Sequence, residues 1–234
     1  MMRLDQIFGR GLFSTVVAGL TAGPGAAHPH VFIDTSVTAI LDQNGQLTAI
    51  RLRWDYDDYV SMLLVEDKGA DTDADGTISS AEMVALEGFD MVWNDGFDGD
   101  ASLIQAEMLL PLKPGPLDWV TGWAVVEDGG HLWSQHTRKL VSPVDLAQGP
   151  VSIVVYDVTD YTAYALSVAR LLPGDPAGAV PVDCRIGPSS EVAVDTGFLS
   201  TLGLFFFGSD DSATTGSVVP VAAPGRVVAV LSCN

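Results

Sequence analysis

A twelve-residue acidic loop at residues 71–82 restricts the possible folds of this chain more than any other feature. It reads DTDADGTISSAE, with acidic residues at alternate positions, then a glycine and a final glutamate. Oxygen donors at these spacings surround a single Ca²⁺, and the loop that carries them joins two helices in an EF-hand. The alternative is a solvated acidic turn, for which Asp and Gly are also suited. We predict a calcium site with the ligands Asp71, Asp73, Asp75, Thr77, Ser79 and Glu82.

The segments on either side of this loop have helical periodicity, whereas most of the chain has the alternation of β-strands. Apolar residues recur every three or four positions over residues 56–67 and 80–94. Strand patterns cover residues 31–40, 47–54, 103–112, 119–127, 132–140, 151–158 and 226–231, and residues 161–171 favour a short helix. Asn44-Gly45, between the first two strands, is typical of a hairpin turn. The predicted fold class is α+β, an antiparallel β-sheet domain with a helix–EF-hand loop–helix unit inserted at about residues 56–94.

The N-terminal segment has the composition of a secretory signal peptide. Arg3 and Arg10 flank a short apolar stretch, and small residues precede a predicted cleavage after Ala27. The apolar stretch is too short to anchor a protein in a bilayer. We therefore predict a signal peptide at residues 1–27, a single exported domain at residues 28–234 and a periplasmic location.

The two cysteines, Cys184 and Cys233, are an even number in a chain that we expect to be exported. In an oxidising compartment this favours one disulfide, which would close a loop of about 50 residues. A pair of thiolate metal ligands is the less favoured alternative, because the cysteines are far apart in sequence and form no Cys-x-x-Cys motif.

The acidic balance of the chain excludes two classes of partner. A formal net charge of −19 repels nucleic acid and anionic lipid, so we predict neither as a ligand. The same acidity attracts cations, although it could serve solubility alone. The chain has no Ser/His/Asp order, no glycine-rich phosphate loop and no reactive thiol, and we predict that it is not an enzyme.

The four histidines form two pairs. If residues 28–34 begin a strand, His28 and His30 point to one face, and Asp34 shares that side. His131 and His136 are separated by an odd number of residues, so on a regular strand they face opposite ways. Imidazole suits Zn²⁺, Ni²⁺ and Co²⁺, and these residues are candidate ligands for such an ion. The alternatives are a frayed polar terminus for the first pair and solvated histidines for the second.

Three segments together resemble an uncharacterised bacterial periplasmic family: AHPHVFID at residues 27–34, LRWDYDDY at 52–59 and VYD at 155–157. Its members are described as periplasmic components of an uncharacterised ABC-type transport system and are commonly encoded beside nickel/cobalt-type permeases. The resemblance implies handling of Zn²⁺, Ni²⁺ or Co²⁺, and it adds Asp157 to the candidate ligands. This chain departs from the family after Asp157, where a proline and a Tyr-Tyr or Tyr-Phe pair are usual.

Two functions are predicted from these observations. The first is an exported metal-binding accessory protein of a Zn/Ni/Co transport system, with a structural calcium site and with a membrane permease or ABC transporter components as partners. The alternative is a calcium-stabilised interaction module without a transition-metal role, which binds a membrane partner through the apolar run at Phe205, Phe206 and Phe207.

Overall fold

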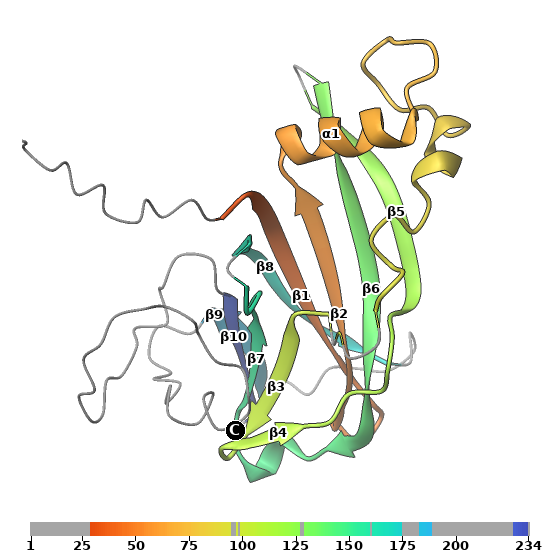
Figure 1. Cartoon of the computed structure of the whole chain (residues 1–234). Helices are drawn as coiled ribbons and strands as arrows, with labels where there is room; N and C mark the ends of the chain where they lie inside the picture. Colours follow the sequence, from red (N-terminus) through yellow and green to blue (C-terminus); the bar gives the residue numbers. More distant parts are fainter. Residues whose placement is uncertain are drawn as a thin grey trace, which may run out of the picture.

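Two five-stranded β-sheets pack around one apolar core in the computed structural model, which describes residues 29–94, 97, 99–126, 129–159, 161–174, 183–188 and 227–233 (Figure 1). Sheet A has the strand order β5-β6-β2-β1-β8, and sheet B has the order β4-β3-β7-β10-β9. Apolar side chains of both sheets fill the core, among them Leu52 and Ile50 of sheet A and Leu103, Ile153 and Leu231 of sheet B.

Sheet A begins with the predicted hairpin. Its strands are β1 (Val31–Leu41), β2 (Leu47–Tyr56), β5 (Leu117–Val126), β6 (Gly129–Val144) and β8 (Thr162–Pro173). The Asp42 carboxylate accepts hydrogen bonds from the N–H groups of Asn44 and Gln46, and Gly45 has a φ of 75°. This turn makes β1 and β2 antiparallel neighbours, as predicted. β8 pairs with β1 in parallel, so the chain crosses over before it returns to this sheet.

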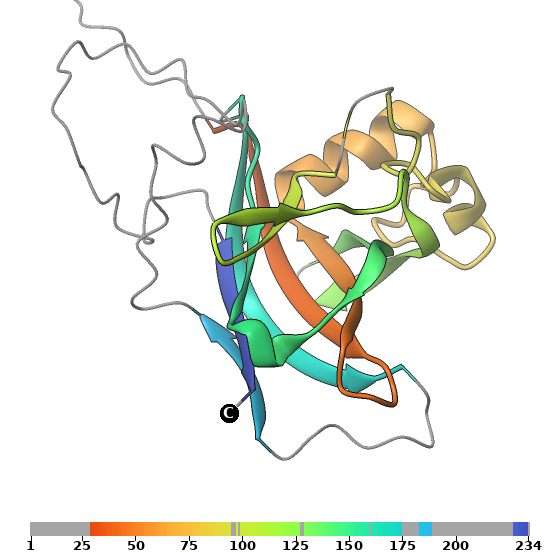
Figure 2. The ribbon, with the colours of Figure 1, turned by 90° about the horizontal axis from the view of Figure 1, so that it is seen from below.

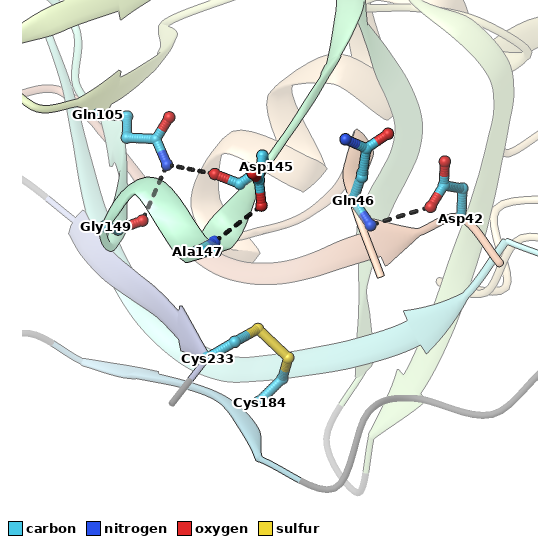
Figure 3. The surroundings of a disulfide bond; sticks show 8 residues. All are labelled: Asp42, Gln46, Gln105, Asp145, Ala147, Gly149, Cys184 and Cys233. Atoms are coloured by element: carbon cyan, nitrogen blue, oxygen red, sulfur yellow. Dashed lines mark hydrogen bonds between the residues drawn. A yellow bond between two sulfur atoms is a disulfide. The ribbon is translucent and has the colours of Figure 1, made fainter. Parts of the chain in front are cut away.

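Sheet B is antiparallel throughout and carries the disulfide. Its strands are β3 (Ala101–Gln105), β4 (Met108–Leu110), β7 (Val151–Val155), β9 (Cys184–Pro188) and β10 (Val227–Cys233). Cys184 and Cys233 are register partners on β9 and β10 and form the predicted bond (Figure 3). Nearby, the Gln105 amide donates to the carbonyl oxygens of Asp145 and Gly149, which bracket the short 3-10 helix η2 (Leu146–Gln148). β8 of sheet A contacts both β9 and β10, and Figure 2 shows how sheet A curves to bring this edge beside them.

The helix α1 (Asp58–Lys68) lies across one end of sheet A (Figure 1). Asp57 caps it, because one carboxylate oxygen accepts from the Val60 N–H and the other from the Phe32 N–H of β1. Ser61, which is fully buried, accepts a hydrogen bond from the Leu132 N–H of β6. These bonds attach the first predicted helix firmly to sheet A.

The predicted α+β class with an inserted helix–EF-hand loop–helix unit is wrong. The structure is mainly β-sheet, and α1 is the one α-helix in the part of the chain that it describes. Residues 80–94 form only the 3-10 helix η1 (Glu82–Leu86), followed by turns. Ala81 gives this helix no side-chain cap, and Gly88 reverses the backbone with a φ of 65°. After this reversal, Asp90 accepts a hydrogen bond from the Tyr56 hydroxyl of sheet A.

The short helix predicted at residues 161–171 is also wrong, since this segment is the strand β8. Short apolar runs do not distinguish a buried helix from a strand by periodicity alone. Here the segment pairs with β1 at eleven register positions, and Tyr164 is buried in the core. These tertiary contacts favour a strand.

Several predictions concern residues that the structure does not describe. The predicted signal peptide, His28 and the apolar run that contains Phe205, Phe206 and Phe207 all lie outside the described residues. Over the residues that are described, no helix has the length and apolarity needed to cross a membrane.

Candidate metal centre

The acidic loop 71–82 follows α1 directly and is anchored at two points. Gly69 ends the helix in a left-handed conformation, and Ala70 after it is buried in the core. Ile78 is buried as well, so the backbone returns to the core before η1 begins. Between these anchors the loop is exposed, and Figure 1 shows it projecting beyond the end of α1. Gly76 has a φ of 78°, a conformation that favours glycine and provides the predicted sharp turn.

Three carboxylates of this loop converge. Oxygen atoms of Asp71, Asp73 and Glu82 lie within 4.8 Å of one another. No other group of three or more His, Cys, Asp or Glu side chains in the described part of the chain brings its donor atoms this close together. Like charges at this separation repel, and a divalent cation between them would offset the repulsion.

Glu82 reaches back across the loop and is held as an anion. Its Oε1 accepts from the N–H and hydroxyl of Thr72, and its Oε2 accepts from the N–H and hydroxyl of Ser79. The hydrogen bond from the Thr72 hydroxyl, followed by those from Ser79, lowers the pKa of Glu82 to about 2. Its carboxylate is therefore charged at neutral pH and points into the loop.

The predicted calcium ligands also form hydrogen bonds within the loop. Asp75 accepts from the N–H and hydroxyl of Thr77, and Ser79 donates to Glu82. Asp71 accepts from the N–H groups of Asp75 and Gly76. The residues present fit a hard cation, because the loop offers three convergent carboxylates with further oxygens of Asp75, Thr77 and Ser79 alongside.

Three of the candidate transition-metal ligands, His30, Asp34 and His131, lie on the outer side of sheet A, away from the core. His30 is exposed just before β1, with its ring 5.2 Å from that of Tyr161. Asp34 is exposed and is the register partner of Asp55 on β2. His131 of β6 places its Nε2 3.5 Å from Asp55 Oδ1. Thus His30, Asp34 and His131 share a face, but their donor atoms do not form a close cluster.

His136 occupies the opposite face. It is fully buried between sheet A and the segment that follows η1, with its ring in edge contact with Trp54 and Trp93. Neither ring nitrogen has a hydrogen-bond partner in the described part of the chain. Burial, together with the charge of Arg138, lowers the pKa of His136 to about 3. It cannot share an ion with the outward-facing histidine on the same strand.

Asp157 has a structural role in the turn that precedes β8. Its Oδ1 accepts from the N–H and hydroxyl of Thr159, and its Oδ2 accepts from the Thr162 N–H. Partial burial opposes ionisation, but these hydrogen bonds hold its pKa below the usual value. Its carboxylate is therefore engaged within the turn and is not directed at His30 or Asp34.

Comparison with known proteins places the chain in a family. A sequence match to the family described as "Protein of unknown function (DUF1007)" covers residues 13–185, about three quarters of the chain. The chain belongs to the DUF1007 family. No curated protein matches it.

The match includes both groups of candidate ligands in this DUF1007 protein. It spans loop 71–82, β1 and β6, and it ends just after Cys184. The second cysteine of the disulfide, Cys233, lies beyond it.

One buried polar cluster of this DUF1007 protein was not predicted. Asp90 accepts hydrogen bonds from the hydroxyl groups of Tyr56 and Ser134, and burial raises its pKa. Ser134 and His136 are the two inward-facing residues of β6 that follow the apolar Leu132. Polar residues at strand positions that should face a core are the signal that could have revealed this cluster.

Proposed function

We propose that this DUF1007 protein is an exported divalent-cation-binding protein, and that loop 71–82 holds Ca²⁺. The convergence of Asp71, Asp73 and Glu82 carries the proposal. Calcium takes six to eight oxygen ligands, and a loop rich in carboxylates and hydroxyls suits it better than nitrogen-preferring metals. The disulfide supports export, because such bonds persist in oxidising compartments. The periplasm and a cleaved signal peptide are part of the same proposal.

The cation would stabilise the end of sheet A. Loop 71–82 connects α1, which packs on β6, with η1, which contacts both α1 and β5. Bound Ca²⁺ would neutralise the three carboxylates and fix the separation of these two elements. Such a clamp needs no second loop of the same kind.

The first test is calcium titration of protein stripped on a chelating resin. We expect heat of binding by calorimetry, and we expect Glu82→Gln to weaken binding by about tenfold or more, because the variant loses a charged ligand that closes the site. With free Ca²⁺ at about 100 times Kd, the wild type should gain about 2.7 kcal/mol and melt roughly 5–10 °C higher.

Glu87→Gln is the matched control for this titration. Glu87 is exposed at the end of η1, and its replacement makes the same change in charge outside the loop. Equal calcium affinity in wild type and Glu82→Gln, or no binding by the wild type at millimolar Ca²⁺, would reject the calcium site.

We further propose an accessory role in the transport of Zn²⁺, Ni²⁺ or Co²⁺, with a membrane permease or ABC transporter components as partners. The outer face of sheet A supports it, because His30, Asp34 and His131 are on that face and Asp55 lies between the last two. Imidazole and carboxylate together suit these ions. The resemblance of residues 27–34 and 52–59 to periplasmic transport components points to the same role.

A zinc titration distinguishes this role from a calcium function alone. Because each imidazole supplies a ligand atom, His30→Ala and His131→Ala should each weaken Zn²⁺ binding about tenfold or more by calorimetry. His136→Leu, which removes a buried imidazole on the other face, should leave it unchanged. Zinc affinity that is equal in all four proteins would refute the site on the outer face.

A further inference from the structure

The positive charges of this acidic chain are concentrated on one surface. Of the eight Lys and Arg residues in the described part of the chain, four lie on the outer face of sheet A, namely Arg51, Arg53, Lys139 and Arg170. The formal net charge of the chain is −19, so a cluster of basic side chains is opposite to its overall character. This surface is separate from loop 71–82.

The strand register brings the arginines of this surface together. Thr38 of β1 is the register partner of Arg51 on β2 on one side and of Arg170 on β8 on the other. Arg53 is the next outward-facing residue after Arg51 on β2, and its register partner is Ser36. Neighbouring like charges destabilise a sheet unless something offsets them.

These side chains line a groove of about 270 Å³. Its walls are formed by Ser36, Thr38, Arg51, Arg53, Gln135 and Arg170. Every one of these side chains can donate hydrogen bonds, through guanidinium, hydroxyl or amide groups, and none is a carboxylate. Such a lining is matched to a ligand that only accepts hydrogen bonds and carries negative charge.

The arginines differ in what they already bind. Arg53 makes a two-pronged ion pair with Asp55 and lies over the ring of Trp133, with its Cζ 4.0 Å from the ring centre. Its charge is therefore largely offset. Arg51 makes no such pair with any residue that the structure describes, and its Nε is buried without a hydrogen-bond partner among them. A buried donor of this kind is costly unless a ligand completes its bonding.

A second hollow shares one of its lining residues with the groove. It has a volume of about 590 Å³, shares Arg51 with the groove and adds Lys139 at its edge. Apolar side chains form much of its wall, including Ile40 and Leu172, and Asp118 is the one acidic residue among the described residues that line it. The two hollows together could hold a charged group and a less polar body attached to it.

We propose that this groove binds a small molecule with a multiply charged oxyanion group, either a phosphate ester or a polycarboxylate. The oxyanion would lie between the guanidinium groups of Arg51 and Arg170, where planar donors match carboxylate and phosphate geometry. The hydroxyls of Ser36 and Thr38 and the amide of Gln135 would supply further donors. This site goes beyond the proposed cation binding and shares no residue with loop 71–82.

The test is calorimetric titration with inorganic phosphate and, separately, with citrate, on protein freed of metal ions by a chelating resin. Resin treatment matters, because both probes complex divalent cations and a soluble chelator is itself a polycarboxylate. Binding of either probe at up to millimolar concentration identifies the chemistry that the groove prefers, and binding that weakens with added salt is expected for an exposed charged site.

Substitutions then assign the binding to the groove. Arg51→Gln and Arg170→Gln should each weaken binding about tenfold or more, because each removes a charge-assisted pair of hydrogen bonds. Arg185→Gln, on β9 of sheet B, is the charge-matched control and should bind as the wild type does. Arg170 is exposed on an edge strand, so its replacement should fold normally even if Arg51→Gln does not.

Three results would overturn the proposal: no binding of either probe, affinity unchanged in Arg170→Gln, or an equal loss in Arg185→Gln. None of these bears on calcium, because the groove and the acidic loop are on different elements. A protein that binds Ca²⁺ but neither anion would retain the proposed function and lose this inference alone.

Discussion

Loss of the disulfide between Cys184 and Cys233 is expected to lower the free energy of unfolding by about 4 kcal/mol. The bridge joins residues 49 apart in sequence, and a crosslink over such a loop removes much of the conformational entropy of the unfolded chain. It also ties the edge strand β9 to β10, with which it pairs in sheet B. A domain is typically stable by only 5–15 kcal/mol, so this loss is large.

The measurement is thermal or urea unfolding of the double variant Cys184→Ser/Cys233→Ser beside the wild type. The melting temperature should fall on the order of 10 °C. A reducing agent should lower the stability of the wild type and leave the double variant unchanged, which serves as the internal control. A double variant as stable as the oxidised wild type would show that the crosslink adds nothing to the pairing of β9 with β10.

The buried His136 is expected to make the protein sensitive to acid. Its pKa is about 3 in the folded state, against about 6.5 in an unfolded chain. The folded state therefore binds fewer protons than the unfolded state between these two values, and stability falls as the pH is lowered through this window. The contribution of His136 to the free energy of unfolding is fully present above pH 6.5. It should decrease by about 2 kcal/mol by pH 5 and further towards pH 3.

His136→Leu isolates this effect from other acid-sensitive groups. The depressed pKa values of Asp157 and Glu82 also destabilise the fold at low pH, whereas the raised pKa of Asp90 acts in the opposite direction. Subtracting the urea stability of the variant from that of the wild type at each pH cancels these shared terms. Leucine of similar volume should be tolerated at pH 7, because neither imidazole nitrogen forms a hydrogen bond with a described residue. If the stabilities of wild type and His136→Leu fall in parallel from pH 7 to pH 5, the prediction is contradicted.

Local patterns predicted much of the strand content correctly. The β1–β2 hairpin follows from alternation and from the Asn44-Gly45 turn, whose backbone conformation is set by neighbouring residues alone. The helix predicted at residues 56–67 corresponds to α1, because its apolar spacing is a local pattern as well. The pairing of Cys184 with Cys233 was correct because only one pairing of two cysteines exists.

The second helix and the segment that became β8 were beyond local prediction. Both have apolar spacing compatible with a helix, and their conformations depend on partners far away in sequence. Gly88 and the contact of Asp90 with Tyr56 end η1 early, while β1 recruits residues 162–173 as a parallel strand. Tertiary pairing outweighs helix propensities of a few tenths of a kcal/mol per residue.

The acidic loop shows what the sequence by itself determined. Asp71, Asp73, Gly76 and Glu82 lie within twelve consecutive residues, so their spacing alone brings three carboxylates together once the turn at Gly76 forms. The outer groove shows what only the tertiary structure decided. Arg51 and Arg170 are more than a hundred residues apart, and they face one ligand-sized space only because β1 pairs with β2 on one edge and with β8 on the other. Strand order across a sheet is set by burial of the whole core, and no short segment encodes it.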